Sequence, residues 1–181
     1  MKKIYIVLTH TGTILSKIVR FYTRKKYSHV SIGLDLNLNE LYSFGRLNPN
    51  NPYKGGFVKE EINKGIFAKF KNTDGAVYSV TITEEQYNTI KEEIEKFKIE
   101  KNKYKFNILG LFLVCIRIKY QRKNHFYCAE FVKYLLEKAF NKKLLPEIIT
   151  PMDFLKLENT NLIYEGKINN YNIENKMKIA V

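Results

Sequence analysis

The apolar residues of this chain occur in short runs separated by turn-forming segments, and this spacing constrains the fold more than any other feature. The longest apolar run covers residues 108–116, and Arg117 follows it directly. A membrane-spanning helix needs about 20 apolar residues, so the sequence predicts no such span. No internal repeat or low-complexity linker divides the 181 residues. We therefore expect a single domain over residues 1–181, with a hairpin-plus-helix insertion around residues 60–105.

Strands are expected where apolar residues are consecutive and β-branched, or where they alternate with polar ones. Residues 4–8 form such a consecutive run, and residues 28–34 alternate. Turn formers follow the second run, and residues 40–44 are expected to return as its paired strand. Residues 46–54 contain two prolines and several Asn residues, which predicts a structured loop. Residues 162–168 are expected to form a final strand.

Helices are expected where apolar residues recur every three to four positions. This spacing predicts helices over residues 13–22 and 126–140. Thr83 and Gln86 have the spacing of a capping box, which predicts a helix from Thr83 to about residue 101. Just before it, residues 65–71 and 76–82 flank an Asn-Thr-Asp-Gly turn and are expected to pair as a hairpin. Residues 108–118 fit a buried helix or a strand, because periodicity does not separate the two.

The net charge indicates which kinds of partner this chain can bind. The net charge is +13, from 31 basic and 18 acidic residues, and only five of the basic residues are Arg. Arg is the residue that reads phosphates in a fixed bidentate geometry, so a Lys-rich excess indicates weak, salt-sensitive attraction to anionic surfaces and no specific nucleic-acid partner. Two cysteines do not make a disulfide framework in a chain of this length. With no signal-peptide pattern at the start, we expect a cytoplasmic protein.

Cys128 is the first candidate for chemistry. It falls at the start of the helix expected over residues 126–140, where the positive end of the helix dipole favours the nucleophilic thiolate. It also lies on the apolar stripe of that helix, so a purely structural role is the alternative. Cys115, inside the apolar run, is expected to be the less reactive thiol.

A thiol nucleophile needs a base, and three histidines are available. His29 begins the strand of residues 28–34, on the strand face opposite Val30. It would form a Cys–His dyad with Cys128 if the two lie close together. His125 and His10 are the competing bases. Cys115, His125 and Cys128 match no common zinc spacing, and no glycine-rich phosphate loop is present, so neither a metal nor a cofactor is expected.

Three motifs, taken in order, carry a resemblance to a known family. They are Tyr-Ser-His-Val-Ser-Ile at residues 27–32, Phe-Tyr-Cys-Ala-Glu-Phe-Val at residues 126–132 and Ile-Thr-Pro-Met-Asp-Phe at residues 149–154. Together they resemble the YiiX-like branch of the circularly permuted papain-like proteins, in the NlpC-type cysteine peptidase superfamily, which is related in fold to lecithin retinol acyltransferase. The His motif precedes the Cys motif, as in the permuted group. The resemblance covers residue 4 to about residue 154. It implies an α+β fold in which the Cys-bearing helix packs against an antiparallel sheet that carries the His.

The resemblance also implies roles for individual residues. Cys128 would be the nucleophile, His29 the base, and the backbone N–H of Cys128 an oxyanion donor. In such proteins a polar residue on the next strand, often Glu, orients the His. Counting along the expected hairpin places Ser43 there, with Glu40 or Asp35 as alternatives.

The implied chemistry is acyl transfer through an acyl-enzyme, which cleaves an amide, peptide or ester bond of a small-molecule, peptide or lipid-like substrate. Two other functions remain open. A non-catalytic binding module for anionic lipid or cell-wall fragments would suit the basic excess and the absence of Glu at position 43. A lipid acyltransferase or amidase at a membrane surface would suit the apolar run at residues 108–116 and the basic segment at residues 117–123.

Overall fold

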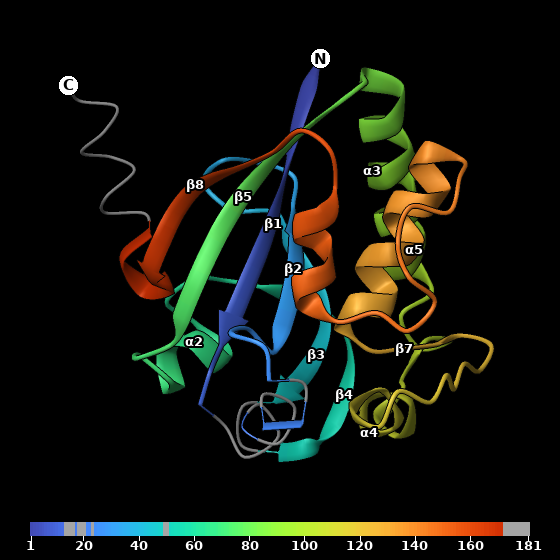
Figure 1. Ribbon diagram of the computed structural model, residues 1–181. Coiled ribbons are helices and arrows are strands. Elements are labelled where there is room, and N and C mark those ends of the chain that lie inside the picture. The colour runs from blue at the N-terminus through green and yellow to red at the C-terminus, as the bar shows by residue number, and fades with distance from the viewer. Residues whose placement is uncertain (13–16, 18–20, 23, 49–50, 172–181) are drawn as a thin grey trace.

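A six-stranded antiparallel sheet organises the part of the chain that the computed structural model describes, which is every residue except 13–16, 18–20, 23, 49–50 and 172–181 (Figure 1). The strand order is β4-β3-β2-β1-β5-β8. The strands are β1 (Lys2–His10), β2 (His29–Gly33), β3 (Leu41–Asn48), β4 (Asn51–Glu60), β5 (Asp74–Ile82) and β8 (Thr160–Lys167). The fold is therefore α+β, as expected.

Helices surround this sheet. They are α2 (Gly65–Lys69), α3 (Glu84–Ile99), α4 (Ile108–Cys115) and α5 (Cys128–Phe140), with two short 3-10 helices, η1 (Pro151–Lys156) and η2 (Ile168–Asn170). Figure 1 shows α3 and α5 side by side along one face of the sheet. Within the described residues, no helix is both long and apolar enough to cross a membrane.

Strand β1 shows how the sheet supports two cores. Successive side chains of a strand point to opposite faces. Ile4 and Ile6 join the core beneath α3 and α5, whereas Tyr5 and Val7 join a second cluster that includes Phe67 of α2. Because both faces are covered, residues 4–8 are apolar without alternation.

The two long helices begin and end at clear local signals. The Thr83 hydroxyl accepts a hydrogen bond from the Gln86 N–H at 3.1 Å, and the Gln86 side chain accepts one from the Thr83 N–H at 2.9 Å. This is the expected capping box. Helix α5 buries the face that carries Phe131 and Leu135. It ends at Asn141, whose φ of 49° is the left-handed conformation typical of helix C-termini.

Helices α4 and α5 both start from one small parallel sheet, made by β6 (Lys105–Phe106) and β7 (His125–Phe126). The side-chain oxygen of Asn107 accepts a hydrogen bond from the Gly110 N–H at 3.1 Å and so caps α4. The sequence left open whether residues 108–118 form a helix or a strand. Residues 108–115 are helical.

Most expected elements are present, and two expectations are wrong. Residues 65–71 do not pair with 76–82: β5 is flanked by β1 and β8, so it has no free edge, and residues 65–69 form α2 instead. Residues 46–54 are not simply a loop, because β3 continues to Asn48 and β4 starts at Asn51. The expected helix over residues 13–22 falls mainly outside the described residues.

Candidate active site

Cys128 is the first residue of α5, and its neighbours hold it in place. The side chain is 5% exposed. The hydroxyl of the preceding Tyr127 donates to the Ile149 carbonyl at 3.0 Å, and the Tyr127 N–H donates to the Glu130 carboxylate at 3.1 Å. As the first helical residue, Cys128 has a backbone N–H with no partner inside the helix. The start of α5 therefore presents a thiol and an N–H group together.

His29 is the first residue of β2, and a buried carboxylate holds its ring. Nε2 of His29 lies 2.8 Å from Oε1 of Glu60, the last residue of β4. The Ser31 hydroxyl donates to the other oxygen, Oε2, at 2.5 Å. The Glu60 side chain is 6% exposed. A carboxylate this deeply buried requires such partners, and the three side chains form one hydrogen-bonded group.

Glycine at position 45 gives Glu60 room to reach His29 across an intervening strand. Strands β2 and β3 pair Ile32 with Tyr42 and Gly33 with Leu41. Extending this register places Gly45 opposite His29. A Cβ atom at Gly45 would lie 3.5 Å from Oε1 of Glu60 and 3.5 Å from Cε1 of His29. A longer side chain there would compete with the two groups for the same space.

The same register corrects the expectation for Ser43. Ser43 falls opposite Ser31, two residues away from the position opposite His29. Its hydroxyl donates to the Val30 carbonyl at 2.7 Å. The residue that contacts the His29 ring is Glu60, so the assignment of Ser43 as the orienting residue is wrong.

The alternatives Glu40 and Asp35 are also engaged elsewhere. Glu40 accepts from Lys59 at 2.5 Å and from the Tyr42 hydroxyl. Asp35 accepts backbone N–H groups of the turn that joins β2 to β3. Neither carboxylate serves the His29 ring in these contacts.

The electrostatics of His29 favour its charged form. Burial lowers the pKa of the imidazole, but the Glu60 carboxylate raises it, and so do the charge and the hydrogen bond of the Cys128 side chain. The net pKa of His29 is well above its ordinary value. The structure thus brings Cys128 and His29 together, with His29 held as an imidazolium near neutral pH.

The other two histidines have different partners. Nδ1 of His125 donates to the Lys123 carbonyl at 2.8 Å, and Nδ1 of His10 lies 3.1 Å from the Ser28 hydroxyl. The Cys128 side chain, by contrast, is among the groups that raise the pKa of His29.

A pocket of about 260 Å³ opens onto these groups. Cys128, His29 and Glu60 contribute to its wall. Most of the remaining wall is apolar and comes from Phe44, Leu47, Val58, Phe67, Phe106 and Leu111. Basic side chains also border it, at Arg46, Lys59 and Lys64. Such a mixture of an apolar wall and a few polar groups is typical of a small-molecule site.

Sequence reasoning missed Glu60 because it missed strand β4. With residues 46–54 taken as a loop, no strand placed Glu60 beside the His-bearing hairpin. The available signal was weak: a carboxylate at the end of a stretch that can pair with residues 41–48. Within the described residues, no group of three or more His, Cys, Asp or Glu side chains is arranged to hold a metal ion.

Comparison with known proteins adds a fold relationship. No family model matches the sequence, and no curated protein matches it. A solved structure has a similar fold. This is the metalloprotein YiiX from Escherichia coli O157:H7, with a TM-score of 0.56 and 12% sequence identity over 91% of this chain and 97% of that one. The chain therefore has a YiiX-like fold.

Proposed function

We propose that this chain is a thiol hydrolase of the permuted papain-like class, with Cys128 as nucleophile, His29 as its acid and base, and Glu60 as the residue that positions His29. The observation that carries the proposal is the meeting of a helix-start thiol, an imidazole and a buried carboxylate at one pocket. A nucleophile, a base and a third group that orients the base form the general pattern of covalent acyl-transfer catalysis.

The proposed reaction has two halves. In the resting site the thiol proton of Cys128 is already on His29, as a thiolate–imidazolium pair, and the thiolate attacks the substrate carbonyl carbon to form a C–S bond. The backbone N–H of Cys128 donates a hydrogen bond to the oxyanion that develops. His29 returns the proton to the leaving amine or alcohol as the C–N or C–O bond breaks. His29 then takes a proton from water, the resulting hydroxide attacks the thioester, and Cys128 is released.

Glu60 acts through His29 and does not touch the substrate in this scheme. Its carboxylate stabilises the imidazolium and fixes the ring orientation, which a serine hydroxyl at position 43 would do less well. One argument for a non-catalytic binding module was the missing carboxylate at position 43. Glu60 supplies that carboxylate from the next strand, so the argument no longer applies.

The pocket supports an acyl substrate with a small apolar group. Its wall is mainly apolar, and Arg46 favours an anionic group at its border, whereas Lys59 and Lys64 are paired with Glu40 and Glu61. The scissile bond is an amide, peptide or ester. YiiX is described as a metalloprotein, but the described residues of this chain do not form a metal-ligand cluster. No step of the proposed reaction is therefore routed through a metal.

A chromogenic ester tests the proposal without knowledge of the natural substrate. p-Nitrophenyl acetate should give a burst of nitrophenol equal to the enzyme concentration, because the acetyl-enzyme accumulates. Cys128→Ala should abolish the burst, and Cys115→Ala should leave it intact. Mass spectrometry of the quenched reaction should place the acetyl group on Cys128. A burst that persists in Cys128→Ala, or no acetylation of Cys128, would contradict the proposal.

A further inference from the structure

Helix α4 is apolar on both of its faces. Its inner face, with Gly110, Leu111 and Val114, is buried. The outward side chains are apolar as well: Ile108 is 38% exposed, Leu109 46%, Phe112 42% and Ile116 58%. We call these four residues the α4 face. A helix without a polar side requires an apolar environment on the outside as well.

The α4 face differs from the isolated exposed apolar residues elsewhere on the protein. Leu162 on β8 and Ile99 at the end of α3 are exposed and apolar too, but each stands alone within its element. Isolated cases of that kind are normal on protein surfaces. Ile108, Leu109 and Phe112 are neighbours at helical spacing on α4, and Ile116 follows one turn later at its C-cap, so the four residues form a stripe.

Basic residues flank this stripe in the sequence, and no acidic residue lies among them. Residues 101–125 contain seven basic residues and no Asp or Glu; the seven are Lys101, Lys103, Lys105, Arg117, Lys119, Arg122 and Lys123. Lys103 and Lys119 form ion pairs with Glu100 and Glu147. No ion pair is recorded for the other five within the described part of the chain. Unpaired basic side chains are therefore available to an anionic partner.

We propose that the α4 face docks this protein onto the surface of an anionic lipid bilayer. Apolar side chains of an interfacial helix enter the boundary between headgroups and acyl chains, and Lys and Arg beside them bind anionic headgroups. Charge complementarity selects this occupant. A second copy of the chain would bring the five basic side chains that have no ion pair among the described residues against five like charges, whereas an anionic bilayer neutralises them.

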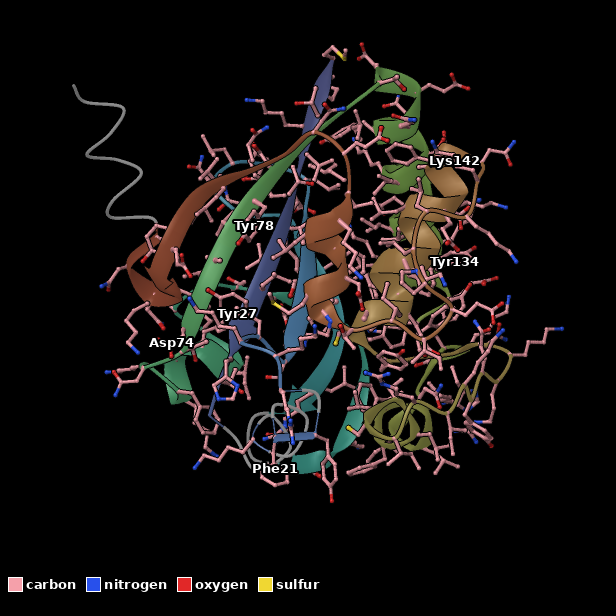
Figure 2. The ribbon with its side chains drawn as sticks, viewed as in Figure 1. Phe21, Tyr27, Asp74, Tyr78, Tyr134 and Lys142 are labelled. Atoms are coloured by element: carbon pink, nitrogen blue, oxygen red, sulfur yellow. The ribbon has the colours of Figure 1, made fainter. Side chains whose placement is uncertain are left out.

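The docking face adjoins the candidate active site. Phe106 and Leu111, from β6 and α4, line the pocket that holds Cys128. Phe21, which is 77% exposed, lies at the same lower end of the molecule as α4 (Figures 1 and 2). A bilayer bound to the α4 face would therefore lie close to the pocket.

Vesicle sedimentation tests the proposal directly. The intact protein is mixed with vesicles of phosphatidylcholine alone or with 30% phosphatidylglycerol added, a mole fraction chosen to give a strongly anionic surface. We expect binding to the anionic vesicles that weakens with salt, and little binding to the neutral ones. Leu109→Glu/Phe112→Glu should reduce binding by about tenfold or more. Leu162→Glu, an exposed apolar site on β8, should leave it unchanged.

A charge-matched pair separates a docking site from general basicity. Arg122→Gln/Lys123→Gln should weaken binding by roughly fivefold for each charge removed. Lys142→Gln/Lys143→Gln removes the same charge at the opposite end of the molecule, where Figure 2 labels Lys142, and should have much less effect. Equal losses in the two pairs would overturn the proposal, as would unchanged binding of Leu109→Glu/Phe112→Glu.

Two further measurements test the docking proposal. A wild-type dimer in sedimentation equilibrium that Phe112→Glu converts to a monomer would identify the α4 face as a contact between copies and overturn the proposal. Cys128→Ala should bind vesicles as the wild type does, because docking needs no catalysis. Loss of membrane binding and loss of ester hydrolysis are therefore separate results.

Discussion

The two cysteines of this chain lie at opposite ends of two helices that start from the same small sheet. Cys128 begins α5, and Cys115 ends α4. The positive end of a helix dipole favours a thiolate, and the negative end disfavours it. Cys128 also faces the imidazolium of His29, whereas burial raises the pKa of Cys115, whose thiol donates to the Leu111 carbonyl at 3.6 Å. Helix polarity and a charged partner thus distinguish two thiols of the same chain.

The two helices also differ in the polarity of their outward surfaces. Helix α5 buries one face and turns Lys133, Glu137 and Lys138 away from the core, as suits a helix bordered by water. Helix α4 has no charged residue at all. In the two proposals above, α5 contributes the nucleophile of the pocket and α4 contacts the bilayer.

The largest expected effect is the difference in reactivity between the two thiols. With limiting iodoacetamide at pH 7, Cys128 should be alkylated about tenfold or more faster than Cys115, because the start of a helix and a neighbouring imidazolium both favour the thiolate. Peptide mapping measures the ratio. Accessibility alone predicts the opposite, because Cys128 is buried and Cys115 is only partly so. Faster labelling of Cys115 would reverse the assignment of the nucleophile.

Glu60→Gln should remove most of the difference in alkylation rate between Cys128 and Cys115. The amide keeps the shape of the side chain, but burial then lowers the pKa of His29 with only the Cys128 side chain to oppose it, so the imidazolium is less favoured. Alkylation of Cys128 should slow by about tenfold or more, while that of Cys115 stays constant. Glu61→Gln, which removes an exposed carboxylate paired with Lys64, is the matched control. Equal rates in the two variants would show that Glu60 does not support His29.

Asn107→Ala should loosen the connection between the two helices. Besides capping α4, the Asn107 amide donates to the Glu130 carboxylate of α5 at 3.2 Å and to the Tyr120 carbonyl at 3.0 Å. Loss of the cap and of these buried bonds should lower the free energy of unfolding by about 1 to 2 kcal/mol. Urea denaturation monitored by circular dichroism measures it. Asn107→Ser retains a capping oxygen and should recover part of the loss; no recovery would mean that the cap contributes little.

Many of the strands and helices could be predicted from the sequence because each has a local signal of its own. The strands at residues 4–8 and 28–34 and the helices after Thr83 and Tyr127 each have their own periodicity or cap. His29 and Cys128 could be paired as a hypothesis because each begins an element and the order of motifs resembled a known fold. Their catalytic roles remain predictions.

What the sequence could not predict depends on pairing between distant segments. The position opposite His29 is decided by the β2–β3 register, and an error of two residues moved it from Gly45 to Ser43. Glu60 reaches His29 because β4 pairs with β3, and Gly45 leaves room between the two side chains. Similarly, β5 looked like half of a local hairpin, but its partners are β1 and β8. Long-range pairing leaves little trace in local sequence.

The smallest expected effect concerns Glu130, which joins the start of α5 to Asn107. Burial raises its pKa from 4.5 to about 7, and the hydrogen bonds from Tyr127 and Asn107 only partly oppose this. Between these two values the folded state binds more protons than the unfolded state, so stability should fall as the pH rises through about 7. Partial exposure screens this loss to about 1 kcal/mol. Glu130→Gln cannot ionise, so its urea midpoint should vary less between pH 5 and pH 8 than that of the wild type. If the wild type instead becomes more stable over this interval while Glu130→Gln does not, the carboxylate is stabilised in its ionised form. The start of α5 would then tolerate a negative charge beside Cys128, which would weaken the electrostatic contrast between the two thiols.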